Sequence, residues 1–138
     1  MKNVQIIIVL LMVLLLSACQ EKMSPLVEGS VMYKSQDGLW VKKSLTQQQL
    51  QALSLWLVRN SSKWGRCFIT PPSQTLSISL KHADGSSSYL AQLNFTNSQT
   101  TLMASHLSGS NLSDQPCALQ SFSESEIDAL HKAIDVSR

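Results

Sequence analysis

The chain has 138 residues, of which 11 are lysine or arginine and 9 are aspartate or glutamate, so its formal net charge is +2. A charge this small gives no electrostatic basis for binding nucleic acid, which requires a basic patch. The length suits one small domain with a single core. Only 14% of the residues are charged, and serine is abundant, a composition that is ordinary for an exported protein.

The first segment has the pattern of an export signal. Lys2 and the amino terminus supply positive charge, and the eleven residues from Ile6 to Leu16 are all apolar. A run of this length matches the hydrophobic region of a secretory signal, commonly ~7 to 15 residues. It is shorter than the ~20 residues that a membrane-spanning helix needs.

The four residues that end this segment, Leu16-Ser17-Ala18-Cys19, resemble the lipobox of bacterial lipoproteins. That motif is an aliphatic residue, two small residues and the cysteine that becomes the new amino terminus. The resemblance implies that residues 1–18 are a lipoprotein signal peptide and that Cys19 carries a diacylglyceryl group and an acyl chain such as palmitate. Several chains together give a stable membrane anchor. The alternative is a plain secretory signal cleaved nearby, with Cys19 an ordinary thiol.

The residue after the lipobox bears on which membrane holds the protein. In lipoproteins of this class, an aspartate directly after the cysteine tends to retain the protein in the inner membrane. Here that residue is Gln20. The resemblance therefore implies an anchor in the outer membrane, with the protein facing the periplasm.

Residues 19–28 show no sustained periodicity, and we interpret them as a short lipidated tether. Each residue of such a tether reaches at most ~3.3 to 3.6 Å, so the domain stays close to the lipid surface. Residues 29–138 are then expected to form a single small domain.

A β-hairpin is predicted where two short apolar runs flank Asp37-Gly38, a strong short-range turn signal. A two-residue turn at this dipeptide sets Tyr33 opposite Lys42 and Trp40 opposite Ser35. Neither face of the hairpin is then cleanly apolar, so an aromatic side chain is expected to be exposed.

A helix is predicted from Leu45 to Asn60. Thr46 and Gln49 have the spacing of a capping box, in which the hydroxyl and the amide each satisfy a free backbone N–H. The apolar residues that follow at helical spacing predict the buried face: Leu50, Leu53, Trp56 and Leu57.

A second hairpin is predicted around Asp84-Gly85, where alternating apolar and polar residues flank the turn. A two-residue loop there sets Leu80 opposite Tyr89 and Leu76 opposite Leu93, all on one face. A further antiparallel strand is expected over residues 100–104.

The last helix repeats the pattern of the first one within residues 122–137. Ser123 and Glu126 form the capping box, and an apolar stripe follows at Ile127, Leu130 and Ile134. The sequence therefore predicts an α+β fold, with two helices packed on an antiparallel β-sheet of about five strands. The order is hairpin, helix, hairpin plus strand, helix.

Cys67 and Cys117 remain once Cys19 is assigned to lipid. An even number of cysteines in an oxidising compartment is most simply one disulfide. Closing a loop of ~50 residues would stabilise the domain by ~4 kcal/mol in the chain-entropy model. A catalytic thiol or a metal site is the alternative, although neither cysteine lies in a C-x-x-C spacing.

No residue pattern identifies a catalytic centre. The three histidines, His82, His106 and His131, lack metal-ligand spacing, and no G-x-S-x-G elbow or phosphate-binding loop is present. We expect no metal and no cofactor. Cys67 with His106 imitates the pair of a thiol hydrolase, so a cell-wall or envelope hydrolase is an alternative, but no nucleophile motif surrounds this cysteine.

Protein binding is the function that the sequence favours. The pattern does not secure the burial of Tyr33, Trp40 and Trp64, and large aromatics often anchor interfaces. The polar loop over residues 105–114, with Ser110 within it, is a second candidate surface. Small lipoproteins include enzyme inhibitors, immunity proteins and accessory subunits of envelope assemblies. We therefore expect a non-catalytic module of the inhibitor or immunity type that binds an envelope or periplasmic protein, with an assembly accessory as the alternative.

Overall fold

A computed structural model of the chain describes residues 23–61, 64–67, 73–93, 100–106 and 117–136. The predicted lipidation site, Cys19, and the predicted surface residue Ser110 lie outside these ranges. The described elements, in chain order, are β1 (Leu26–Lys34), β2 (Trp40–Ser44), α2 (Gln47–Asn60), β3 (Gly65–Arg66), β4 (Gln74–His82), β5 (Ser87–Leu93), β6 (Thr100–Ser105), β7 (Ala118–Phe122) and α3 (Glu124–Ile134).

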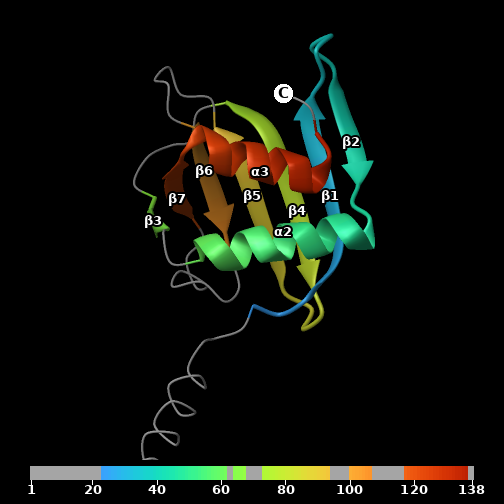
Figure 1. Cartoon of the computed structure of the whole chain (residues 1–138), viewed down its shortest axis with the longest axis vertical. Coiled ribbons are helices and arrows are strands. Elements are labelled where there is room, and N and C mark those ends of the chain that lie inside the picture. The colour runs from blue at the N-terminus through green and yellow to red at the C-terminus, as the bar shows by residue number, and fades with distance from the viewer. Residues whose placement is uncertain (1–22, 62–63, 68–72, 94–99, 107–116, 137–138) are drawn as a thin grey trace, which may run out of the picture.

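The strands form one antiparallel sheet in the order β2-β1-β4-β5-β6-β7-β3 (Figure 1). The α+β class is confirmed, but the sheet has seven strands rather than about five. The additional strands are β7 and the two-residue β3. β3 pairs with β7, which is remote in sequence, and β7 pairs with β6 across the long connection of residues 106–117, so no short hairpin turn announces either strand.

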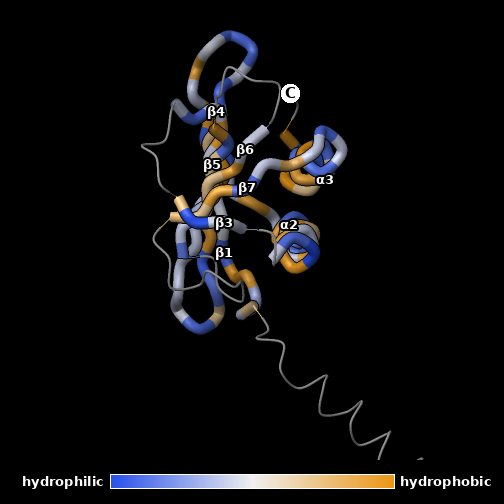
Figure 2. Tube along the Cα trace, turned by 90° about the vertical axis from the view of Figure 1, so that its left-hand side faces the viewer, coloured by the Kyte–Doolittle hydropathy of each residue, from blue (hydrophilic) through white to orange (hydrophobic). Residues whose placement is uncertain are grey.

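The two helices lie across the same face of the sheet (Figure 2). They run antiparallel, because Trp56 Nε1 in the second half of α2 donates to the carbonyl of Glu126 at the start of α3. At the other end, Gln49 Nε2 lies 3.5 Å from the carbonyl oxygen of Ile134. The core fills the space between this helix pair and one face of the sheet. In the described residues, neither helix is long and apolar enough to span a membrane.

Both predicted capping boxes are confirmed. Thr46 caps α2, with Gln49 closing the box, and Ser123 caps α3, with Glu126 closing the box. The buried residues of the two helices include the predicted stripes: Leu50, Leu53, Trp56 and Leu57 in α2, and Ile127, Leu130 and Ile134 in α3.

Gly29 lies at the contact between the sheet and the start of α2. A Cβ atom at this position would lie 2.9 Å from Leu50 Cδ2, 3.0 Å from Leu45 Cδ1 and 3.0 Å from Leu80 Cδ2. Carbon atoms rarely lie this close, so a larger residue at this position would force the packed leucine side chains to shift.

The two Asp-Gly turns have three-residue loops, and the predicted two-residue turns are wrong. In the first, the Ser35 N–H donates to the Leu39 carbonyl, and the Gly38 N–H donates to the Ser35 carbonyl. His82, Gly85 and Ser86 repeat this arrangement in the second. Each glycine has a positive φ, 79° and 85° respectively, as the bulge that closes a three-residue hairpin requires.

The longer loops shift both predicted registers by one residue. Trp40 pairs with Lys34 rather than Ser35, and Tyr33 pairs with Val41 rather than Lys42. In the second hairpin, Leu80 pairs with Ser88 rather than Tyr89, and Leu76 with Gln92 rather than Leu93. Because side chains alternate along a strand, this shift moves Tyr89 and Leu93 away from the face that carries Leu76 and Leu80.

The folded part of the chain begins earlier than expected. Residues 26–28, which the sequence assigns to the tether, form the first part of β1, and Leu26 is buried. Met23 packs against the core, and the carbonyl of Pro25 accepts from the Ala83 N–H at 2.8 Å. β1 therefore begins inside the segment that the sequence assigned to the tether.

Candidate functional site

Trp64 is a core residue, so its assignment to a binding surface is wrong. Only 4% of its surface is exposed. Its ring packs edge-on against Phe122 with centroids 5.5 Å apart, and Phe122 also contacts Trp56 at 5.1 Å. Among the described residues, Trp64 Nε1 has no hydrogen-bond partner. The residue that covers it lies in β7, so the local sequence could not reveal its burial.

Tyr33 is half-buried and packs against the core at the end of β1. It pairs with Val41 on one side and Leu76 on the other, on the face of the sheet that carries the helices. It therefore supports the hairpin rather than forming an open contact surface.

Trp40 is exposed, with 52% of its surface open. Leu39 beside it is 69% exposed, and Met32 on the neighbouring strand is 45% exposed. Trp40 pairs with Lys34, and Met32 pairs with Lys42. The side chains of these four residues therefore lie on one face of the sheet, opposite the helices. We call Met32, Lys34, Trp40 and Lys42 the hairpin patch; Leu39, which pairs with Ser35, belongs by the same alternation to the other face. The sequence predicted only Trp40 of this set.

β2 is an edge strand of the sheet, since only β1 pairs with it within the described residues. The Leu45 N–H donates to the Gly29 carbonyl, and the Leu39 carbonyl accepts from Ser35, so odd-numbered residues of β2 face β1. In an antiparallel pair the alternate residues direct their N–H and C=O groups outward. Trp40, Lys42 and Ser44 therefore present their backbone groups on the free edge.

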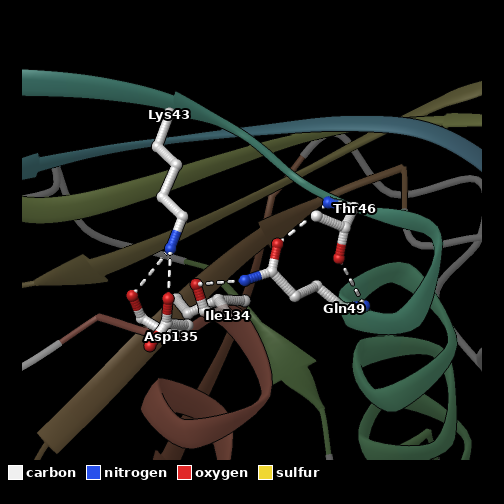
Figure 3. Close-up of polar contacts among 5 residues, drawn as sticks. All are labelled: Lys43, Thr46, Gln49, Ile134 and Asp135. Carbon is white, nitrogen blue, oxygen red and sulfur yellow. Dashed lines mark hydrogen bonds and ion pairs between the residues drawn. The ribbon is translucent and has the colours of Figure 1, made fainter.

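Two sets of side-chain contacts fix this edge to the rest of the domain (Figure 3). Lys43 Nζ donates to Asp135 Oδ2 at 2.7 Å and to the Asp135 backbone carbonyl at 2.9 Å. Gln49 closes the Thr46 cap while its amide reaches toward Ile134. The end of β2 and the start of α2 are thus held to the end of α3.

The two helices border a groove of about 510 Å³. Ala52, Ala129 and Ala133 are among its small apolar residues, and Arg59 and Lys132 add positive charge. Leu55, 60% exposed, also lines this groove. The sequence could have indicated an apolar surface here, because Leu55 and Val58 fall outside the buried stripe of α2.

Another hollow, of about 430 Å³, is lined by residues of β1, β4, β5 and the end of β6. Most of its lining residues have polar side chains, among them Ser30, Ser79, Lys81, Tyr89 and His106. The Tyr89 hydroxyl is already engaged, since it donates to Gln74 Oε1 at 2.6 Å.

The cysteines and histidines have structural contacts. Cys67 and Cys117 form the predicted disulfide, with their Cα atoms 5.3 Å apart. His82 is buried between the Ser24 carbonyl and the Ser88 hydroxyl, at 2.8 and 2.7 Å. His131 Nε2 lies 2.8 Å from Gln92 Oε1. Across the described ranges, no three His, Cys, Asp or Glu residues gather in a way that could hold a metal ion.

Two carboxyl groups have shifted acidities, and both are explained by local structure. Hydrogen bonds from the Ser86 hydroxyl and backbone N–H hold the pKa of Asp84 below its usual value. The hydrogen bond and positive charge of Lys43 likewise lower the pKa of Asp135. One group stabilises a turn and the other a helix end.

The hairpin patch lies at the opposite end of β1 from the point where the chain enters the domain (Figure 1). At the entry, Ser24 and Pro25 bond to residues of the β4–β5 turn. β1 has nine residues, which at ~3.4 Å each give a strand of roughly 30 Å. The patch is therefore about one domain length from the amino-terminal segment.

Comparison of the chain with protein-family models, with curated proteins and with solved structures finds no match. The interpretation of the hairpin patch therefore depends on its geometry.

Proposed function

We propose that this protein is a non-catalytic protein-binding module, anchored by lipid on Cys19 to the periplasmic face of the outer membrane. Its contact surface is the hairpin patch. The observation that supports this most directly is the exposure of Trp40 on an edge strand, beside exposed Leu39 and Met32. A tryptophan with apolar neighbours and a basic rim has the composition of an interface anchor.

The position of the patch favours a protein partner over the lipid surface to which the chain is tethered. Residues 20–22 separate Cys19 from Met23, and four peptide steps of at most ~3.6 Å reach about 14 Å. The entry end of the domain would then lie near the lipid. The hairpin patch, at the other end of β1, would point into the periplasm, where a soluble or membrane-bound protein can reach it.

Site-specific crosslinking in cells tests this function. A photo-reactive benzoylphenylalanine in place of Trp40 should give a discrete protein adduct. The same residue in place of Leu55, which is equally apolar and exposed on the opposite side of the domain, is the matched control. An adduct from position 55 alone would move the contact surface to the helices, and no adduct from either position would overturn the proposal.

The lipid-free protein distinguishes the two kinds of partner. An inhibitor or immunity module should bind its target equally well with Cys19→Ala, because the folded domain makes all the contacts. An accessory subunit of a membrane assembly should lose its function with this change even though the domain folds. In either case Trp40→Ala should remove the adduct formed from a second patch position, such as Met32.

A further inference from the structure

We propose that the partner binds by adding a strand to the free edge of β2, and that this strand is extended and acidic. This inference depends on the proposed function, since it specifies how the hairpin patch engages its partner. Strand addition obtains affinity from main-chain hydrogen bonds and specificity from the side chains that flank them.

The backbone of β2 has groups free to make the main-chain hydrogen bonds that strand addition needs. The hydrogen bonds from Leu45 to Gly29 and from Ser35 to Leu39 show that the odd-numbered residues of this segment face β1. The backbone N–H and C=O groups of Trp40, Lys42 and Ser44 therefore point away from β1. No other described strand pairs with this side. An incoming strand therefore meets a row of donors and acceptors at the spacing of a sheet.

The side chains of β2 select the chemistry of that strand. Trp40 and Lys42 project to the face without helices, next to Lys34 and Met32. Residues of the added strand that share this face would lie beside them. A carboxylate opposite Lys42 would form a cross-strand ion pair, and an apolar residue opposite Trp40 would cover its ring.

A second copy of this chain fits the edge poorly. In an antiparallel pairing of two β2 strands through their outward-facing residues, the two Lys42 side chains lie opposite or diagonal to each other on one face. Like charges in such positions are destabilising. Lysine on an edge strand is a common protection against pairing with the wrong strand, and the same charge favours an acidic one.

The edge is also held in place before it binds. Lys43 projects to the other face, where its charge is paired with Asp135, so it does not compete for the acidic strand. Hydrogen bonds from Leu45 to Gly29 and within the Thr46 cap fix the end of β2. An ordered edge lowers the entropic cost of adding a strand.

Amide hydrogen exchange on the purified protein in detergent micelles tests strand addition. The probes are three synthetic peptides of alternating valine and a variable residue, which is glutamate, glutamine or lysine. The glutamate peptide should slow exchange at the outward amides of Trp40, Lys42 and Ser44, with little change at Val41 and Lys43. Its affinity should exceed that of the lysine peptide by ~10-fold, because one attractive pair replaces one repulsive pair.

Three variants of Lys42 separate the backbone contribution from the charge. Lys42→Pro removes an outward N–H without breaking a bond to β1 and should abolish the protection. Lys42→Ala keeps that N–H and should reduce only the preference for glutamate. Lys42→Glu, an exposed change that leaves the backbone intact, should reverse the preference toward the lysine peptide. Unfolding midpoints confirm that each variant folds.

The outcomes distinguish this inference from the function on which it depends. If no peptide protects the outward amides, or all three bind equally, strand addition is wrong. In that case crosslinking from position 40 can still capture a partner. Such an adduct would support the proposed function, with binding through side chains instead of an added strand. A dimer in sedimentation that Lys42→Pro dissociates would make a second copy the occupant and overturn the acidic partner.

Discussion

Lys43 on the edge strand and Asp135 at the end of α3 join two ends of the domain that are 92 residues apart in sequence. The ammonium group contacts both the carboxylate and the backbone carbonyl of Asp135. Asp135 is the left-handed C-cap of α3, with φ 53°, so the positive charge also lies at the negative end of the helix dipole. This pair connects β2 directly to the end of α3.

The Lys43–Asp135 pair should contribute to stability in a pH-dependent way. Its lowered pKa means that the Asp135 carboxylate is favoured in the folded state. The contribution is therefore fully present above the usual value of 3.8 and is lost as pH falls through the lower folded value. Asp135→Asn, which keeps a residue that tolerates the left-handed conformation, should reduce the free energy of unfolding at pH 7.

Urea unfolding of both proteins at a series of pH values measures this effect. The difference between them should be constant from pH 6 to 8 and should shrink as the carboxylate becomes protonated. A difference that persists unchanged at pH 2 would show that the pair acts through packing and not through charge.

The local parts of this fold are predictable from sequence, whereas the strand register is not. The Thr46–Gln49 and Ser123–Glu126 boxes form as predicted, because a capping box involves only residues three apart. The dipeptide at Gly38 predicts a turn but not its length. A two-residue turn and a three-residue loop with a bulge both place glycine at positive φ, and here the longer loop forms.

Exposure of the aromatic residues also depends on long-range pairing. Trp40 and Trp64 each lie within two residues of a glycine, and neither local sequence shows a pattern that secures burial. Trp64 is covered by Phe122 from a strand near the end of the chain, while Trp40 lies on an edge with no strand beyond it in the described part of the chain. Only the order of strands in the sheet separates a core residue from a surface one.

Replacing each buried tryptophan with phenylalanine should give unequal losses of stability. Trp56→Phe removes the hydrogen bond from Nε1 to the Glu126 carbonyl, in addition to part of the ring. Trp64→Phe removes ring volume but no hydrogen bond within the described residues. The free energy of unfolding should fall by ~1 kcal/mol more for Trp56→Phe, the usual net value of one such bond. Equal losses in urea unfolding would indicate that packing dominates at both positions.

Gly29→Ala should destabilise the domain by ~1 to 3 kcal/mol, the usual range for overpacking a core. The new methyl group would press on Leu45, Leu50 and Leu80, all of which belong to the packed interface between α2 and the sheet. Gly65→Ala is the matched control. At that position a Cβ would meet only the Leu119 carbonyl oxygen, at an ordinary 3.6 Å, so its thermal unfolding should change little. Similar losses for both variants would contradict the close approach of the helix at Gly29.

The disulfide should supply a large share of the stability of so small a domain. Cys67 and Cys117 are 50 residues apart, and closing a loop of that length stabilises by ~4 kcal/mol in the chain-entropy model. The double change Cys67→Ser with Cys117→Ser should lower the free energy of unfolding by about that amount. Reductant should have the same effect on the natural protein and none on the double variant. Two labelled thiols at these positions in the denatured, unreduced protein would show that the bond is absent in cells.

Removing the predicted lipid attachment should change location without changing the fold. Cys19 precedes Met23, where contacts with the core begin, so Cys19→Ala touches no packed residue among those described. The variant should leave the membrane fraction as a soluble or unprocessed form, because no lipid chains remain to anchor it. Its unfolding midpoint should match that of the natural domain. Ser17→Thr, a change within the same segment that keeps the cysteine, controls for general effects on export. If the Cys19→Ala protein still sediments with membranes, another part of the chain must hold it there, and the orientation inferred for the hairpin patch no longer follows.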